Sequence, residues 1–321
     1  MPSTSRPSTQ CDRRRALPLC RRGLRAVLLT LGACALAHGA QARILVHDDS
    51  GQVLALAHPA QRIVALSPQL VELADAAGAD QHLVATIRGA DWPHSARSLP
   101  RVGDAFAINL EAVVTLKPDL ILAWRSGTPP RQVDALRRLG IPVYWSQTDS
   151  LQAIASTVQR IGELAGTAPT ATRWTRAFDA RLAALRARYA HQPPVRVFYQ
   201  VWPEPLMTVG GPQLLNQAIT LCGGVNPFAA LPVLAPSVSR EAVIAADPQL
   251  IVAASRNRAA LDAWTQYGQI SAVRHRQLLL LDPRLLPRMG ERVLDGVAQL
   301  CAAVEDTRRI DGRSAPAASK R

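Results

Sequence analysis

The first half of the chain alternates short aliphatic runs with amphipathic stretches. Residues 62–66 contain a β-branched and aliphatic run that predicts a buried strand. Ser67 then supplies a helix N-cap, with Pro68 at the first helical position, and Gly78 ends the predicted helix. The pattern therefore predicts a strand, a tight turn and a helix in that order.

The same alternation continues as far as residue 165. A second helix is predicted over residues 133–139, where Gly140 ends it. Because strands alternate with helices, the sheet should be mostly parallel and covered by helices on both faces. Further buried strands are predicted at residues 83–87, 120–123 and 143–145.

A longer helical pattern follows, over residues 170–191. Arginines lie off its apolar stripe, and a Pro-Pro pair at residues 193–194 ends it. At 1.5 Å per residue such a helix spans roughly 33 Å, which is enough to connect two domains. Residues 195–201 then restart the strand pattern. The apolar stripe consists of Trp174, Phe178, Leu182, Leu185 and Tyr189.

An internal repeat relates the segments on either side of this helix. Residues 109–123 match residues 239–253 at 7 of 15 positions. The duplication predicts two similar lobes, each with a helix that leaves through proline into a buried strand. Each copy has an N-cap residue followed two positions later by a glutamate, Asn109 with Glu111 and Ser239 with Glu241.

These patterns predict an α/β fold of two Rossmann-like lobes, with mostly parallel sheets, joined by one long helix. The expected boundaries leave a cleft between the lobes, and ligands of such sheets bind outside the carboxyl ends of the strands. The connecting helix should limit opening to a few degrees, because bending it would break backbone hydrogen bonds. The predicted segments are residues 43–168, the helix 169–192, residues 193–308 and a disordered tail 309–321.

The formal net charge of +13 raises the question of nucleic-acid binding. The first 42 residues contribute a net +6 of it, which leaves +7 for the remaining chain. Nearly all the basic residues are arginines, and a solvated surface explains such a charge without a polyanionic partner. Nucleic acid is therefore not an expected partner.

The first 42 residues have the organisation of an export signal. A basic segment at residues 13–25 precedes an apolar run at 26–37, and residues 40–42 form a small-x-small cleavage site. The mature chain would then begin at Arg43. Two alternatives stay open: a lipobox that ends at Cys34 and would anchor the protein to lipid, and a weak twin-arginine signal. All three predict export to the periplasm.

The cysteines agree with export. Only Cys222 and Cys301 lie beyond the signal, and an even count in an oxidising compartment suggests one disulfide. Two buried free thiols are the alternative.

The sequence lacks the usual catalytic motifs. It has no glycine-rich dinucleotide or phosphate loop and no G-x-S-x-G elbow, and the histidines are scattered without metal-ligand spacing. No enzyme activity and no bound cofactor are therefore expected. An exported two-lobed chain of this kind has the profile of a protein that captures a ligand.

Several segments resemble one known family, and the match extends over residues 62–304. They resemble the periplasmic vitamin B12-binding proteins of ATP-binding-cassette (ABC) importers, within the helix-linked (class III) binding proteins. The segments are residues 109–125, 131–143, 222–228, 238–241 and 299–301.

The resemblance assigns roles to four residues. It implies a disulfide between Cys222 and Cys301, and it makes Glu111 and Glu241 the two acids that dock onto arginines of the permease dimer. A helix dipole also stabilises an acid in the first turn by about 0.3 to 1 kcal/mol, so capping alone is the alternative for each glutamate.

The resemblance further implies that the cleft transports cobalamin, whose apolar faces and amide rim require aromatic walls and a few donors. Trp145, Trp174 and Trp264 are expected to be packing residues instead. The candidate ligand-binding residues are Trp92, Phe106, Trp124, Arg125, Trp202, Phe228 and Arg288.

Some aromatic positions of the family are replaced in this chain. Gly89 stands where a ligand-contacting tyrosine is expected, Ala235 replaces a tryptophan, and residues 284–288 keep an arginine without the aromatic. A haem or ferric-siderophore carrier is therefore the alternative to a corrinoid carrier. An enzyme or metal-cluster protein on the same scaffold is a further hypothesis, because fold does not fix function. The chain is expected to be a monomer.

Overall fold

The computed structural model describes residues 43–314. The predicted export signal, its cleavage site and Cys34 lie outside the described residues. Among the helices that are described, none is long and apolar enough to cross a bilayer.

The first lobe contains a four-stranded parallel sheet in the order β4-β3-β5-β6. Its central pair, β3 and β5, aligns Ile63 with Leu120. An antiparallel hairpin of β1 and β2 precedes the sheet and was not anticipated from the sequence. The strands are β1 (Ile44–His47), β2 (Val53–Leu56), β3 (Ile63–Ala65), β4 (Leu83–Thr86), β5 (Leu120–Trp124) and β6 (Val143–Ser146).

Helices cover this sheet on both faces. Helix α5 was missed in the sequence, although Ser150 caps its start and Gly166 ends it in the left-handed conformation. The helical elements are α2 (Pro68–Ala76), η2 (Asp80–His82), η3 (His94–Ser98), α3 (Leu110–Thr115), α4 (Pro130–Arg138) and α5 (Leu151–Ala165).

The second lobe contains a sheet in the order β11-β10-β7-β8, with β9 paired to β7. Only β8 runs antiparallel, so the prediction of mostly parallel sheets is confirmed. The strands are β7 (Val195–Pro203), β8 (Leu206–Thr208), β9 (Gly224–Val225), β10 (Leu250–Ala254) and β11 (Leu278–Leu281). The helical elements are α7 (Leu214–Leu221), α8 (Arg240–Ala246), α9 (Ala259–Asp262), α10 (Ser271–Arg274), η4 (Leu286–Arg288) and α11 (Val293–Ser314).

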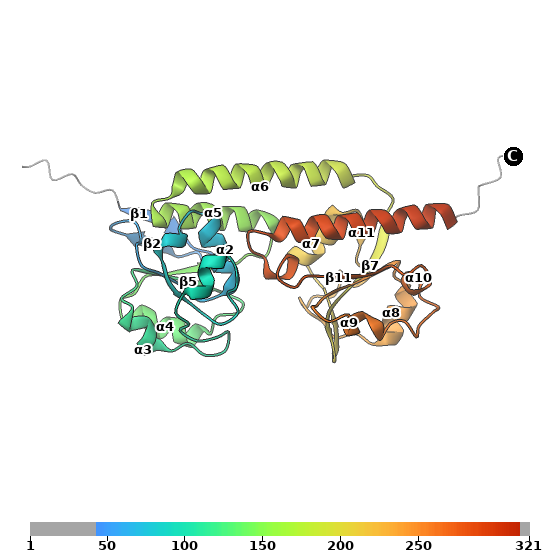
Figure 1. The fold of residues 1–321 in the computed structure, drawn as a ribbon, viewed down its shortest axis with the longest axis horizontal. Coiled ribbons are helices and arrows are strands. Elements are labelled where there is room, and N and C mark those ends of the chain that lie inside the picture. The colour runs from blue at the N-terminus through green and yellow to red at the C-terminus, as the bar shows by residue number, and fades with distance from the viewer. Residues whose placement is uncertain (1–42, 315–321) are drawn as a thin grey trace, which may run out of the picture. The chain divides into compact units, whose positions relative to one another are not determined.

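Helix α6 (Ala168–Tyr189) lies between the two lobes in the chain, close to its predicted range. It packs along α5 toward its start and along α11 toward its end, and both helices lie on the same side of it (Figure 1). Phe178 and Leu182 of α6 belong to one apolar core that extends from Leu70 in the first lobe to Leu300 in the second. The helix is therefore part of the core as well as a connection.

The disulfide pairing is confirmed, since Cys222 is bonded to Cys301. This bond joins the residue after α7 to the middle of α11, and both cysteines are fully buried. The alternative of two free thiols is wrong.

Local details were predicted unevenly. Asn109 and Ser239 accept hydrogen bonds from the backbone of Ala112 and Ala242 at 3.0 and 3.1 Å, which confirms both caps. Ser67 is at the N-cap position of α2, but its side chain makes no capping bond, so that part of the prediction is wrong. Its hydroxyl is buried and has no hydrogen-bond partner among the described residues.

The predicted tail is corrected at its start. Helix α11 continues to Ser314, so residues 309–314 are helical, contrary to the expectation of disorder from residue 309. Residues 315–321 lie outside the described part. The expected boundaries of the lobes themselves stay a prediction.

Candidate ligand site between the lobes

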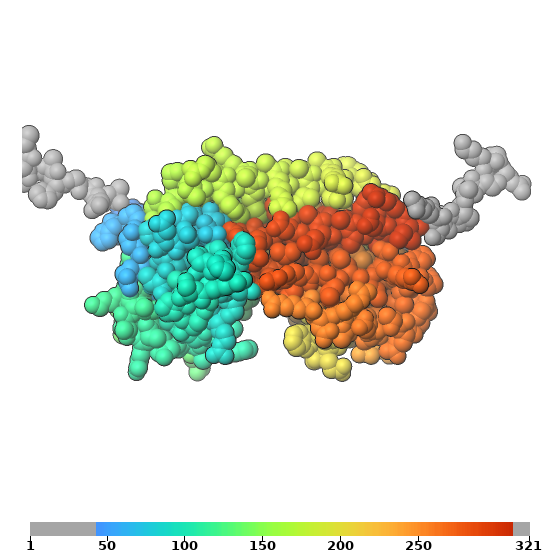
Figure 2. All heavy atoms as spheres, in the orientation of Figure 1, coloured from blue at the N-terminus to red at the C-terminus, as the bar shows by residue number. Residues whose placement is uncertain are grey.

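A hollow separates the two lobes on the side away from α6 (Figure 2). At its base lies a cavity of about 220 Å³ that both lobes line. The first lobe contributes Pro68, Gln69 and Trp124, and the second contributes Pro283, Pro287, Arg288 and Met289. The lining is mostly apolar and carries one cation.

The first lobe positions its share of the cavity through the carboxyl ends of β3 and β5. Pro68 and Gln69 open the helix that follows β3, and Trp124 is the last residue of β5. The Trp124 ring packs directly over Gly127, where an added Cβ would lie 2.1 Å from a ring carbon. Only glycine at position 127 leaves the ring in this place.

Arg288 connects the two lobes at the edge of the cavity. Its guanidinium donates to the Asp91 carboxylate, to Glu72 Oε1 at 3.4 Å and to the Gly89 carbonyl at 3.4 Å. Burial opposes ionisation of Asp91, but the hydrogen bond and the charge of Arg288, together with a backbone hydrogen bond and the charge of Arg284, outweigh it and lower the pKa of Asp91. This predicted ligand donor is therefore already held by first-lobe acceptors.

Trp92 lies beside Arg288 at the same junction. Its indole N–H donates to the Glu291 carboxylate, and the Arg292 guanidinium lies 4.5 Å from the ring centroid. Both partners belong to the second lobe. The Trp92 side chain keeps 39% exposure, so part of it stays available to a ligand.

The pKa of Glu291 is raised well above its ordinary value. Burial, together with the negative charges of Asp75 and Glu72, raises the pKa of Glu291 to about 7, although the Trp92 N–H favours the ionised form. Burial and then the charge of Asp80 also raise the pKa of Asp75. The junction thus concentrates carboxyl groups that the neighbouring arginines partly neutralise.

The structure places Trp124 and Arg288 on one cavity and Trp92 at the junction of the lobes, and the other four candidates do not line that cavity. Phe106 and Trp202 are exposed by 88% and 58%. The Trp202 N–H donates to the Glu204 carbonyl at 2.9 Å.

The last two candidates already have partners within their own lobes. Phe228 packs edge to face on Phe198 at 5.8 Å, which is a contact of the second-lobe interior. Arg125 donates to the carbonyl of Asp49 in the loop between β1 and β2. A direct ligand contact from any of these four residues stays a prediction. Trp145 and Trp264 are buried packing residues, as expected, and Trp174 is partly buried and stacks on Phe178.

Glu72 and Arg292 are the site residues that sequence reasoning missed. Glu72 is fully buried on α2, and Arg292 immediately precedes α11. The available signal was a single acid within the otherwise apolar run of residues 70–74, because a carboxylate in a buried helix face requires a cationic partner.

Glu111 and Glu241 are both exposed in the first turns of α3 and α8. The pKa of Glu241 is lowered by hydrogen bonds from its own backbone N–H and from Ser239. The two glutamates therefore occupy equivalent positions on the duplicated segments.

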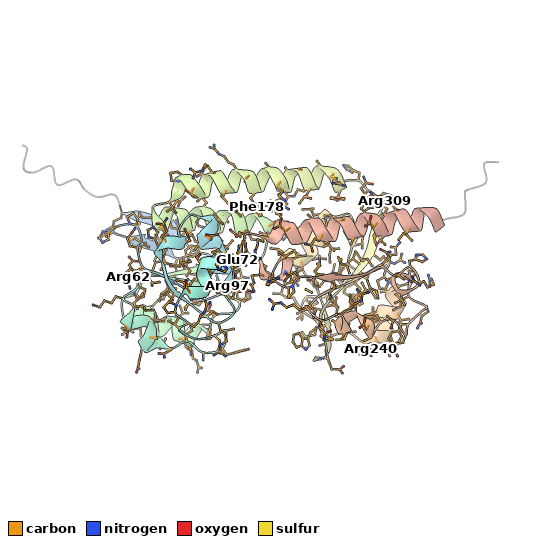
Figure 3. All side chains as sticks on the ribbon, viewed as in Figure 1. Arg62, Glu72, Arg97, Phe178, Arg240 and Arg309 are labelled. Carbon is orange, nitrogen blue, oxygen red and sulfur yellow. A yellow bond between two sulfur atoms is a disulfide. The ribbon has the colours of Figure 1, made fainter. Side chains whose placement is uncertain are left out.

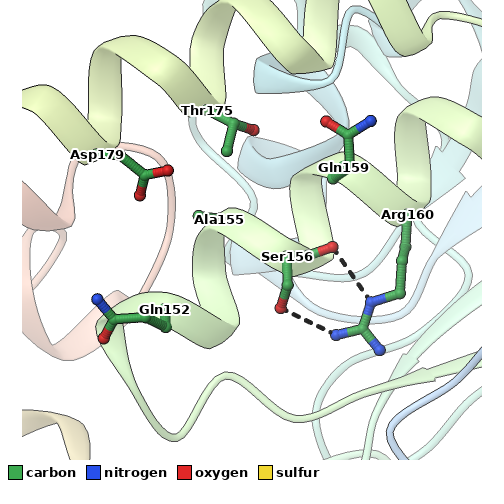
Figure 4. Close-up of a pocket in the computed structure, with 7 residues that line it drawn as sticks. All are labelled: Gln152, Ala155, Ser156, Gln159, Arg160, Thr175 and Asp179. Atoms are coloured by element: carbon green, nitrogen blue, oxygen red, sulfur yellow. Dashed lines mark hydrogen bonds between the residues drawn. The ribbon is translucent and has the colours of Figure 1, made fainter.

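A larger cavity of about 490 Å³ lies between α5 and α6 (Figure 4). Arg160 donates there to the carbonyl and hydroxyl of Ser156 at 3.2 and 3.1 Å. Its lining has no aromatic residue and includes none of the predicted ligand residues. Its polar side chains do not match the apolar faces of a corrinoid.

Sequence comparison decides the family. The profile of the family described as "Periplasmic binding protein" matches residues 63–285. The chain belongs to the periplasmic binding protein family. It is 38% identical over 250 residues to the vitamin B12-binding protein of Vibrio cholerae, covering 78% of this chain and 91% of that one.

Solved structures of periplasmic binding proteins agree. The crystal structure of the periplasmic vitamin B12-binding protein of Vibrio cholerae superposes with a TM-score of 0.73 at 37% identity, over 78% of this chain and 99% of that one. A periplasmic haem-binding protein from Pseudomonas aeruginosa gives 0.67 at 26% identity, over 76% and 92%. The fold is therefore that of a two-lobed, helix-linked binding protein.

Proposed function

We propose that the protein captures a corrinoid, cobalamin, between its lobes and delivers it to the permease of an ABC importer. The observation that carries this proposal is the similarity to vitamin B12-binding proteins over nearly their whole length, at 37–38% identity. The haem-binding relative is less similar, at 26%.

The shape of the site agrees with a large ligand. The cavity of about 220 Å³ is open to the hollow and smaller than a typical ligand pocket, so a corrinoid occupies the hollow and only its edge enters the cavity. Trp124 and the three prolines offer apolar surface, and Arg288 offers N–H donors to the amide rim. The protein supplies binding and no covalent step, so it is not an enzyme and needs no cofactor.

The haem alternative would require an axial ligand. Histidine or tyrosine commonly supplies it, and among the described residues that line the cavity neither type occurs. The part of the ligand that enters the cavity would therefore find no such axial ligand there.

Delivery requires export and docking. Members of this family are periplasmic, and the export signal predicted over residues 1–42 supplies the route. Glu111 and Glu241 are the docking acids, one on each lobe, and they contact arginines of the permease while the protein is a monomer.

Calorimetric titration of the mature chain, residues 43–321, with cyanocobalamin and separately with haemin tests the proposal. One equivalent of cyanocobalamin should bind, and haemin should bind at least a hundredfold more weakly. If haemin gives binding heat and cyanocobalamin gives none, the result contradicts the corrinoid proposal and favours the haem alternative.

A further inference from the structure

A buried carboxylate of the first lobe holds two arginines of the second. The Glu72 side chain is fully buried, and it accepts from Arg292 at 2.7 and 3.3 Å and from Arg288 at 3.4 Å. Figure 3 places Glu72 on the side of the first lobe that faces the second. A carboxylate without water depends entirely on such partners for its charge.

The backbone of the second lobe passes close to this carboxylate at Gly290. A Cβ at Gly290 would lie 2.4 Å from Glu72 Oε2, so the chain approaches the carboxylate where no side chain intervenes. Gly290 lies between the two arginines, and this lets residues 288 and 292 direct their side chains to one acceptor.

Both arginines link Glu72 to the candidate ligand residues. Arg292 stacks on the Trp92 ring at 4.5 Å, and Arg288 lines the cavity. The Trp92 ring is further fixed at its edge because its N–H donates to Glu291. Glu72 itself does not line the cavity, so it acts only through these neighbours.

The loop that carries Trp92 depends on the same contacts. Arg101 donates to the carbonyls of Ala90 and Ala96 at 2.8 and 3.0 Å, which fixes the loop to the first lobe. Arg288 then fixes it to the second lobe through Asp91 and Gly89. The loop is therefore bonded to both lobes at the junction where Glu72 lies.

We infer that Glu72 is a positioning residue of the ligand site, which sets the approach of the two lobes and orients Arg288 and Trp92 toward the ligand. The consequence for cobalamin rests on the proposed function. The orientation of Trp92 without ligand does not, so the two can be tested separately.

The test is Glu72→Gln, which keeps the length of the side chain and removes its charge. In protein with ¹⁵N-labelled tryptophan, the indole N–H resonance of Trp92, assigned with Trp92→Phe, should move. The Trp264 resonance should stay, because that indole bonds to Gln200 at 2.7 Å inside the second lobe and reports an intact fold. Cyanocobalamin affinity should fall about tenfold.

Asp295→Asn is the matched control. Asp295 lies on α11 and pairs with Arg181 of α6 at 2.8 Å, but both side chains are about half exposed. Like Glu72→Gln, this substitution removes one carboxylate from an ion pair with an arginine. Because the pair is exposed and does not contact Trp92, the Trp92 resonance and the affinity should stay unchanged.

Arg292→Lys covers the case in which Glu72→Gln does not fold. Lysine keeps a cation beside Glu72 but loses the guanidinium over the Trp92 ring, so it should also move the Trp92 resonance and lower affinity. A folded Glu72→Gln with wild-type affinity and an unmoved Trp92 signal overturns the inference, as does a wild-type result from Arg292→Lys. If the unmodified protein binds no cyanocobalamin, the proposed function fails and the Trp92 signal still decides the role of Glu72.

Discussion

The indole nitrogen of Trp92 donates a hydrogen bond to the carboxylate of Glu291 across the junction of the two lobes. A candidate ligand residue of one lobe is thereby tied to an ionisable group of the other, and the state of that group should influence how firmly the lobes are joined.

The pKa of Glu291 predicts a pH-dependent stability. Because it is raised from 4.5 to about 7, the folded state keeps a proton that the unfolded chain releases above pH 4.5. This site therefore stabilises the fold at low pH, and its contribution is lost as pH rises from about 4.5 to 7. Glu291→Gln should remove this loss and gain about 1 kcal/mol at pH 8, allowing for solvent screening, as measured by urea unfolding at pH 5 and 8.

Trp92→Phe should shift the pH dependence in the opposite direction, by raising the pKa of Glu291 further. It removes the N–H that favours the ionised Glu291, so the loss of stability should extend to a higher pH. Identical pH profiles in the wild type and Glu291→Gln would show that Glu291 titrates as an ordinary glutamate.

Removing the disulfide should destabilise the protein substantially. The bond between Cys222 and Cys301 closes a loop of 79 residues, for which the chain-entropy model gives about 4.5 kcal/mol. The double variant Cys222→Ala with Cys301→Ala should show this loss in urea unfolding. Wild-type protein in reductant should match the variant, and a difference below about 1 kcal/mol would contradict the expected role of the bond.

A methyl group at Gly127 should displace Trp124 from the base of the hollow. In Gly127→Ala the new Cβ would lie about 2.1 Å from the ring, so the indole has to move. Cyanocobalamin affinity should fall about tenfold, with a stability cost of about 1 to 3 kcal/mol.

Gly268→Ala is the control, because no atom lies within 4 Å of a Cβ at that position. Wild-type affinity in Gly127→Ala would mean that Trp124 does not contribute to the ligand surface.

Charge reversal at the two exposed glutamates should separate docking from binding. Glu111→Arg with Glu241→Arg should reduce cobalamin uptake by cells at least tenfold, because repulsion replaces attraction to the permease. Affinity for cyanocobalamin should stay within twofold of the wild type. Glu163→Arg, an exposed acid on α5, is the control and should leave uptake intact. A loss of affinity in the double variant would place these acids at the ligand instead.

The regular parts of this fold were accessible from sequence because they depend on local patterns. Strand β5 is predicted from its apolar residues alone, since a buried parallel strand is hydrophobic on both faces. The caps Asn109 and Ser239 follow from residue type at a helix start.

The junction of the lobes was not accessible in this way. Glu72 finds its partners 216 and 220 positions later in the chain, and no local period connects such positions. Arg288 was predicted from a family resemblance as a ligand donor, whereas its bonds to Asp91 and Glu72 appear only in the folded chain. Sequence reasoning therefore found candidate ligand residues more readily than the residues that hold them in place.

The apolar core that passes from the first sheet through α6 into the second sheet has a consequence for folding. Phe178 and Leu182 are buried in this core, so cutting away a lobe at either end of α6 would expose part of their apolar surface to water. Melting of the intact protein should accordingly be a single cooperative transition, with neither half surviving alone.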